Sequence, residues 1–181
     1  MATHRGSARR YAEAAFEIAE RDHTVAAWLG DLDTAAAVLG EGAAVHLLSN
    51  PAVPIGEREK VVRDALGERI SDKAANLLLL LVRRGRADLM APVAAEFRRI
   101  HDRREGISHA TVTSAAPLDE AELAALRDRL TGMTGGRVEV TFVVDPALLG
   151  GVVVRIGDRL IDGSVRGRLE RLRNRLAAGA L

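Results

Sequence analysis

The sequence contains no cysteine, so the chain can form neither a disulfide framework nor a thiolate metal site. Aromatic residues are scarce as well, with one Trp, one Tyr and three Phe among 181 residues. So few rings give little material for the stacking platforms that bind nucleic-acid bases. The longest strongly apolar run, from Leu77 to Val82, is far shorter than the roughly 20 residues of a membrane-spanning helix. We therefore expect a soluble protein with only an indirect link to any membrane.

Catalytic and cofactor-binding patterns are also missing. The histidines are scattered, without the spacing of a zinc site: His4, His23, His46, His101 and His109. The glycines form neither a G-x-G-x-x-G nor a phosphate loop, and no serine lies in a G-x-S-x-G elbow. Carboxylate pairs such as Asp31/Asp33 and Glu57/Glu59 fall on expected exposed helix faces, where we expect solvation. The sequence thus predicts no enzyme, no cofactor and no metal site.

Charge is balanced over most of the chain and polarised only at its end. Residues 1–105 carry equal numbers of acidic and basic side chains, residues 106–164 have a net charge of −3, and residues 165–181 one of +4. A basic helix can bind nucleic acid, anionic lipid or an acidic protein. Lysine occurs only at Lys60 and Lys73, so arginine is this chain's usual cation and a solvated face is the simpler interpretation. A nucleic-acid-binding adaptor that uses the basic C-terminal helix is the main alternative function.

The first 105 residues have the pattern of short helices. Apolar residues recur every three or four positions, and Gly, Pro or capping residues separate the segments. The expected helices are 9–21, 25–39, 43–49, 54–66, 72–84 and 88–104. Ser71 is the expected cap of the fifth, and Gly85 its end. Six short helices in this length predict an all-α bundle.

Two of these helices have more apolar surface than one bundle core needs. The helix 9–21 has two adjacent apolar stripes, which together exceed the ~100° face of a surface helix. One stripe comprises Ala12, Phe16 and Ala19, and the other Tyr11, Ala14, Ala15 and Ile18. In the fifth helix, the six consecutive apolar residues from Leu77 to Val82 place apolar side chains on every side of the helix. Each helix is either covered on all sides by its own bundle or offers one face to a partner.

After Gly106 the helical pattern gives way to alternation, so we place a domain boundary there. Residues 107–113 and 138–144 are expected strands, and apolar side chains alternate strictly in the second. Between them, Asp119 and Glu122 form a capping pattern that starts a helix. The order strand, helix, strand indicates a small α/β domain.

The last part of the chain predicts a β-hairpin followed by a helix. A β-branched run at 152–156 suits a strand, Gly157-Asp158 a tight turn and Leu160-Ile161 a short return. Ser164 is the expected N-cap of a terminal helix with one apolar face. The whole sequence therefore predicts an α + α/β architecture, in which a six-helix bundle (1–105) precedes a small α/β domain (106–181) ordered strand-helix-strand-hairpin-helix.

The C-terminal stretch also resembles a family signature. Its elements are Asp145-Pro146, Leu148-Leu149-Gly150-Gly151, a valine strand, Gly157, Asp158, Asp162, Gly163-Ser164 and an Arg/Leu-rich helix. Further matches lie earlier in the chain, at Arg10-Tyr11-Ala12, Phe16 and Ser49-Asn50-Pro51. With this combination the chain resembles the delta subunit of F-type ATP synthases, whose mitochondrial counterpart is the oligomycin-sensitivity-conferring protein.

The resemblance implies a non-catalytic stator subunit that holds the alpha/beta catalytic head to the membrane sector. It implies that the first and fifth helices bind the N-terminal helix of an alpha subunit through Tyr11, Ala14, Ala15, Ile18, Leu78, Leu79 and Val82. It also implies that the C-terminal domain meets the C-terminal ends of the b subunits, the peripheral stalk. The residues expected there are Leu149, Val153, Ile156, Leu160, Leu169 and Leu172.

The expected location follows from the same resemblance. The N-terminus is basic but has no apolar region behind it, so we expect neither a secretory signal nor a transit peptide. This favours a peripheral position on the cytoplasmic face of a bacterial cell membrane, within the ATP synthase complex. Neither nucleic-acid binding nor direct membrane insertion is expected.

Overall fold

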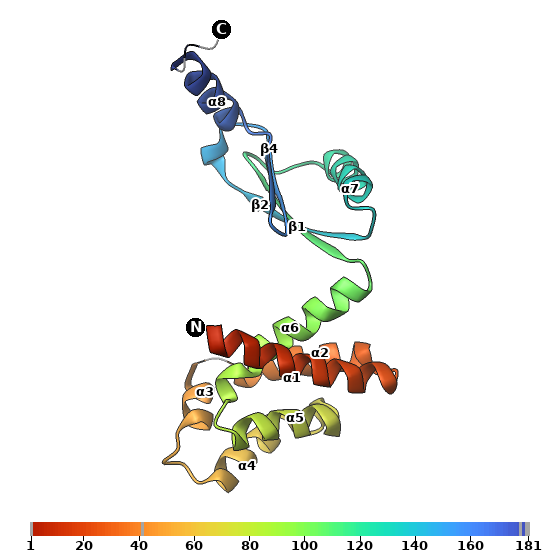
Figure 1. Cartoon of the computed structure of the whole chain (residues 1–181), viewed down its shortest axis with the longest axis vertical. Coiled ribbons are helices and arrows are strands. Elements are labelled where there is room, and N and C mark those ends of the chain that lie inside the picture. The colour runs from red at the N-terminus through yellow and green to blue at the C-terminus, as the bar shows by residue number, and fades with distance from the viewer. Residues whose placement is uncertain (1, 41, 178, 180–181) are drawn as a thin grey trace. The chain divides into compact units, whose positions relative to one another are not determined.

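The computed structural model describes residues 2–40, 42–177 and 179. They divide into two compact units, Met1–Asp102 and Arg103–Leu181. The first unit is helical, and the second contains a mixed four-stranded sheet with two helices (Figure 1). These features agree with the predicted α + α/β class.

The helices of the first unit are α1 (Ala2–Arg21), α2 (Val25–Leu39), α3 (Gly42–Ser49), α4 (Ile55–Leu66), α5 (Asp72–Arg83) and α6 (Met90–Arg104). α1 begins at Ala2, earlier than the predicted start at residue 9. Gly6 in this extension is exposed, whereas Ser7 and Ala8 are buried, so packing against the rest of the unit supports the helix before residue 9. The Ser71 hydroxyl accepts a hydrogen bond from the Ala74 backbone N–H over 3.4 Å, which confirms the predicted cap of α5.

The core of the first unit is built around Phe97. Its ring is fully buried, lies 5.2 Å from the Phe16 ring and stacks 6.0 Å from Trp28. These three side chains join α1, α2 and α6. Around them, alanines on α1 allow close helix packing, and Ala8, Ala12 and Ala19 are completely buried. The helices are therefore held mainly by apolar contacts.

Carboxylates on the helix surfaces link neighbouring helices, which corrects the expectation that they are merely solvated. Asp33 on α2 pairs with Arg98 on α6. Glu59 on α4 pairs with Arg83 on α5 at 2.5 Å, and the guanidinium lowers the pKa of this carboxyl below its usual value. The prediction failed because the partners are far apart in sequence and become neighbours only in the folded unit.

The second unit is a sheet with strand order β2-β1-β3-β4. The strands are β1 (Ser108–Ser114), β2 (Val138–Val144), β3 (Val152–Ile156) and β4 (Arg159–Asp162). β1 pairs in parallel with β2 and antiparallel with β3, which forms the predicted hairpin with β4. The connection from β1 to β2 runs through α7 (Glu120–Thr134), as a parallel pair requires.

The two faces of this sheet differ in how well they are covered. Ala110, Val112 and Val154 face α7 and are buried with its Leu130. The predicted capping box is confirmed at the start of α7, where the Asp119 and Glu122 side chains each accept the other's backbone N–H. Successive side chains of a strand point to opposite faces of the sheet. The face opposite to α7 therefore contains Thr111, Thr113, Val153, Arg155 and Leu160, which line an open hollow. Among the residues that the structure describes, a buried core thus covers one face of the sheet only.

Candidate partner-binding surfaces

Both α1 and α5 have apolar residues that the core leaves exposed or half-buried, on flanks that the Lys73–Asp22 and Arg86–Ser7 contacts bring towards each other. We define the α1–α5 strip as Tyr11, Ala14, Ile18, Leu77 and Leu80. Ala14, Ile18 and Leu80 are exposed, whereas Tyr11 and Leu77 are half-buried. The exposed fractions of Ile18 and Leu80, 37% and 40%, are large for apolar side chains in so well packed a unit. Exposed apolar residues that adjoin one another are typical of a binding surface.

The structure separates the predicted contact residues into two groups. Tyr11, Ala14 and Ile18 belong to the strip, while the other α1 stripe is buried. The remaining four predicted residues are buried in the core: Ala15, Leu78, Leu79 and Val82. Leu77 and Leu80 are the accessible leucines of α5, and the sequence analysis did not select them. Helical spacing could have found them, since Lys73, Leu77, Leu80 and Arg84 recur at intervals of four and three.

Two side-chain contacts join residues in or just after α1 and α5, at opposite ends of the strip. At one end the Lys73 ammonium lies 2.6 Å from the Asp22 carboxylate. At the other, the Arg86 guanidinium donates to the Ser7 hydroxyl over 2.8 Å. The order of these contacts makes the two helices antiparallel. Lys73 and then Arg21 lower the pKa of Asp22 below its usual value.

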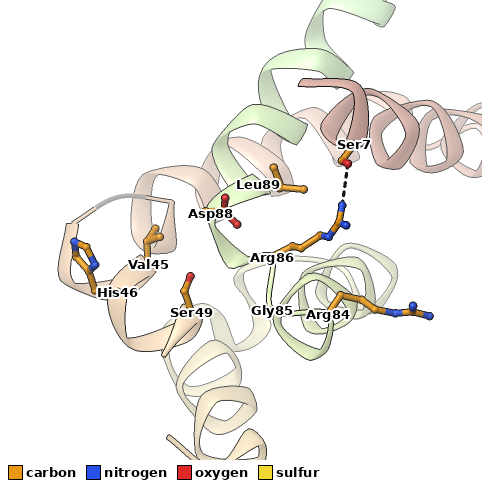
Figure 2. Close-up of a pocket in the computed structure, with 9 residues that line it drawn as sticks. All are labelled: Ser7, Val45, His46, Ser49, Arg84, Gly85, Arg86, Asp88 and Leu89. Atoms are coloured by element: carbon orange, nitrogen blue, oxygen red, sulfur yellow. Dashed lines mark hydrogen bonds between the residues drawn. The ribbon is translucent and has the colours of Figure 1, made fainter. Parts of the chain in front are cut away.

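A pocket of about 580 Å³ adjoins the Arg86 end of the strip. Figure 2 shows Ser7 and Arg86 on one side of it and α3 residues Val45, His46 and Ser49 on another. The Ser49 hydroxyl is buried and has no hydrogen-bond partner among the described residues. The Arg84 side chain points away from this pocket (Figure 2). The pocket is therefore distinct from the strip, although Arg84 and Arg86 both line it.

The hairpin residues selected from sequence do not all lie on one surface. Leu149 and Leu160 are strongly exposed, at 73% and 59%. Val153 is half-buried on the open sheet face. Ile156 instead pairs with the buried Ala110 and packs against the core under α7, because strand alternation places it on the covered face.

Helix α8 (Val165–Ala177) carries an uncovered apolar stripe. We define the α8 stripe as Val165, Leu169, Leu172 and Leu176, which are between 43% and 59% exposed. It contains the two predicted residues Leu169 and Leu172. Leucines at this spacing suit packing against another helix.

The first turn of α8 is fixed to the end of β4. The Ser164 hydroxyl accepts the Gly167 backbone N–H over 3.0 Å, which confirms the predicted N-cap, and donates to the Asp162 carboxylate over 2.7 Å. A Cβ at Gly167 would overlap that carboxylate. The Ser164 hydroxyl, the Ser164 backbone N–H and the Arg171 charge, in this order, lower the pKa of Asp162 below its usual value.

Features of other functional classes have little support in the described residues. Residues 2–40, 42–177 and 179 contain no group of three or more His, Asp or Glu placed to hold a metal ion. Within the same ranges, no helix combines the length and the apolar composition needed to cross a bilayer. Phe142, the one aromatic residue on a strand, is half-buried, with the Arg127 guanidinium 5.8 Å from its ring centre. The ring is therefore not an open platform for a nucleic-acid base.

Comparisons with known proteins agree with the resemblance found in the sequence. The family model "ATP synthase delta (OSCP) subunit" matches residues 8–176. The ATP synthase subunit delta of Desulforamulus reducens is 38% identical over 170 residues, which cover 93% of this chain and 94% of that protein. The same subunit of Methylobacillus flagellatus is 34% identical over 165 residues, or 91% and 93% of the two chains.

A solved structure supports the fold. A chain of the Toxoplasma gondii mitochondrial ATP synthase hexamer matches with a TM-score of 0.69 and 23% identity, over 94% of this chain and 97% of that chain. At this identity the likeness concerns the fold alone. Taken with the family model and the relatives, it leads to one conclusion: the chain belongs to the ATP synthase delta (OSCP) subunit family.

Proposed function

We propose that this protein is a non-catalytic clamp in the stator of an F-type ATP synthase, which holds the alpha/beta head to the peripheral stalk. Membership of the delta (OSCP) family gives the place in the complex. The observation that best supports a clamp is the presence of one uncovered apolar surface in each unit, the α1–α5 strip and the α8 stripe. Rotor torque would turn the head with the rotor unless such a link resisted it.

We propose that the first unit, as a six-helix bundle, binds the N-terminal helix of an alpha subunit along the α1–α5 strip. An amphipathic helix can bury its apolar face against such a surface, and Ala14 between Tyr11 and Ile18 leaves room for close approach. Of the buried predicted residues, Ala15, Leu78 and Val82 act by supporting the strip from beneath. Leu79 lies on the other flank of α5, where it borders a pocket with Val62 and Leu66 of α4.

We propose that the second unit binds the C-terminal ends of the b subunits through the α8 stripe and the exposed hairpin residues Leu149 and Leu160. Helix-to-helix packing would cover Leu169 and Leu172. Val153 borders this surface from the open sheet face, whereas Ile156 supports it from the core. Held by these two contacts, the protein would be peripheral to the cytoplasmic face of the bacterial membrane.

A direct test is titration of the full chain with a labelled peptide of the alpha subunit's first residues, about 20 of them to cover the strip. We expect saturable one-to-one binding, followed by fluorescence anisotropy. Ala14→Asp should abolish it, because an unpaired carboxylate would be buried at the centre of the contact. Ala95→Asp, at an exposed position on α6, is the matched control and should bind like the wild type.

The clamp itself is tested in the assembled enzyme. Head and membrane sector reconstituted with this chain should couple proton flow to ATP synthesis, and the same parts without it should not. The proposal fails if the head and stalk assemble and resist rotation equally well when the chain is left out. A parallel test uses the C-terminal segment of the b subunit, whose binding should be lost with Leu172→Asp and kept with Arg173→Asp.

A further inference from the structure

The two ends of the α1–α5 strip differ in how their charges are paired. At the Asp22 end, the cations Lys73 and Arg21 both form ion pairs with the Asp22 carboxylate. At the other end, Arg84 follows Leu80 by four residues and so lies one turn further along the same flank of α5. Arg84 is exposed and forms no ion pair with any residue that the structure describes. The cations at one end of the strip are therefore paired with a carboxylate, whereas Arg84 at the other end is available to a partner.

Arg86 and Arg10 strengthen the positive charge at this end. Arg86 is exposed and uses one N–H on the Ser7 hydroxyl, whereas a guanidinium has five N–H donors. Its contact with Ser7 also fixes its position beside α1 (Figure 2). Arg10 lies one turn after Ser7, is exposed, and has no ion-pair partner within the described residues. Asp88, the acidic residue of the adjoining pocket, is half-buried on α3's side of Arg86.

The length of the strip decides which part of a bound helix reaches these arginines. From Ser7 to Asp22, α1 extends over about 22 Å, so a partner helix of about 15 residues would cover the strip. On a uniform apolar strip, the partner helix could shift along its axis without a large change in buried area. Charge at one end removes this freedom, because only one direction brings opposite charges together.

Resting on the proposed contact with the alpha subunit, we propose that the basic end formed by Arg84, Arg86 and Arg10 binds carboxylates at one end of the docked helix. These contacts fix the direction and register of that helix. The apolar strip supplies most of the binding, while the arginines select among orientations that bury similar areas. A guanidinium suits this role since it binds carboxylates with two parallel hydrogen bonds.

The test measures binding of the alpha-subunit peptide to the full chain carrying Arg84→Glu. Arg84 lies outside the strip and beyond the core, so the variant should fold normally. We expect the dissociation constant to rise about five- to tenfold at low salt, and this difference to shrink as salt screens the charges. Arg69→Glu makes the same charge change in the turn between α4 and α5, where Arg69 is exposed, and should have almost no effect.

Peptide variants then locate the partner charge. Replacing the peptide's acidic residues one at a time with amides should identify at least one whose replacement removes the difference between wild type and Arg84→Glu. Binding that Arg84→Glu and Arg69→Glu weaken equally would overturn the inference while leaving the proposed function intact. If the peptide does not bind the wild-type chain at all, the proposed contact with the alpha subunit fails, and the basic end loses its assigned partner with it.

Discussion

The two units differ in how they use their apolar residues. Among the residues whose burial is described, the core of the first unit contains 24 buried apolar residues, and that of the second only four. The exposed large apolar side chains show the opposite distribution, because ten of fourteen belong to the second unit. We infer that the core of the first unit is complete without a partner. The second unit, by contrast, needs a partner to bury its exposed apolar side chains.

The binding surfaces differ in the same way. The α1–α5 strip lies on two helices that pack into one core and are linked at both ends, by Lys73–Asp22 and by Arg86–Ser7. Among the described residues, the side-chain hydrogen bonds and the ion pair that join α8 to the end of β4 involve its first two turns, through Ser164, Gly167 and Arg171. The first surface is thus rigid before binding, which lowers the entropic cost of association. The later turns of α8, which carry Leu172 and Leu176, would gain their packing from a partner helix.

The largest expected effect comes from breaking the core of the first unit. Phe97→Ala removes the ring that joins Phe16 and Trp28, and we expect it to lower the free energy of unfolding by about 3–5 kcal/mol. Denaturant unfolding followed by the Trp28 fluorescence measures this loss. Phe142→Ala on β2 is the matched control in the second unit. As a half-buried ring it should cost clearly less, and equal costs would contradict the difference between the two cores.

Local signals in the sequence predicted much of the fold correctly. The caps at Ser71, Asp119 and Ser164 and the hairpin turn at Gly157-Asp158 act over a few residues, so their spacing alone identifies them. The alternation in β2 likewise predicted a strand. These features depend on backbone turns and hydrogen bonds that involve only residues close together in the sequence.

The orientation of α5 and the links between helices were harder to predict. Six consecutive apolar residues give no signal for the buried side within the run itself, which is why Leu78 and Val82 were selected and Leu80 was not. The signal lies outside the run, in Lys73 and Arg84 on the flank of Leu77 and Leu80, and the packing of α2 and α4 against α5 shows the inward face directly. The Asp33–Arg98 pair depends in the same way on the meeting of residues far apart in the chain. The residues that contact a partner are still harder to predict from the sequence, since these contacts also depend on the partner's own surface.

A smaller effect is expected where α8 leaves the sheet. Gly167→Ala would place a methyl group against the Asp162 carboxylate, and we expect this overlap to destabilise the start of α8 by about 1–3 kcal/mol. Faster amide hydrogen exchange in residues 165–177, with unchanged exchange in the first unit, would show it. Gly132→Ala in α7 is the control. Its added Cβ meets nothing within 4 Å, so it should stabilise α7 by about 0.5–1 kcal/mol.

The attachment of α8 should also depend on pH. The folded pKa of Asp162 is lower than its unfolded value, so the ionised carboxylate stabilises the folded form. This stabilisation is complete above the unfolded pKa, near 3.9 for a free Asp, and disappears as the pH falls through the folded pKa. We expect α8 amides to exchange faster, after correction for the intrinsic rate, in this acidic range. Asp162→Asn should remove this pH dependence. If the Asp162→Asn variant still showed it, a titratable group other than Asp162 would be its cause.

The smallest effect is expected at the Asp22 end of the α1–α5 strip. Lys73 is 57% exposed in its ion pair with Asp22, and solvent-exposed pairs contribute little to stability. Lys73→Ala should therefore leave the unfolding midpoint close to that of Lys60→Ala, which removes the chain's other lysine from an exposed site on α4. The pKa of Asp22 is more sensitive, because the Lys73 contact is the largest cause of its lowering. A carboxyl titration by NMR should show this pKa rising towards its usual value in Lys73→Ala and unchanged in Lys60→Ala. If both variants shifted it equally, general charge rather than the Lys73 contact would control Asp22, and the strip would lack a specific link at this end.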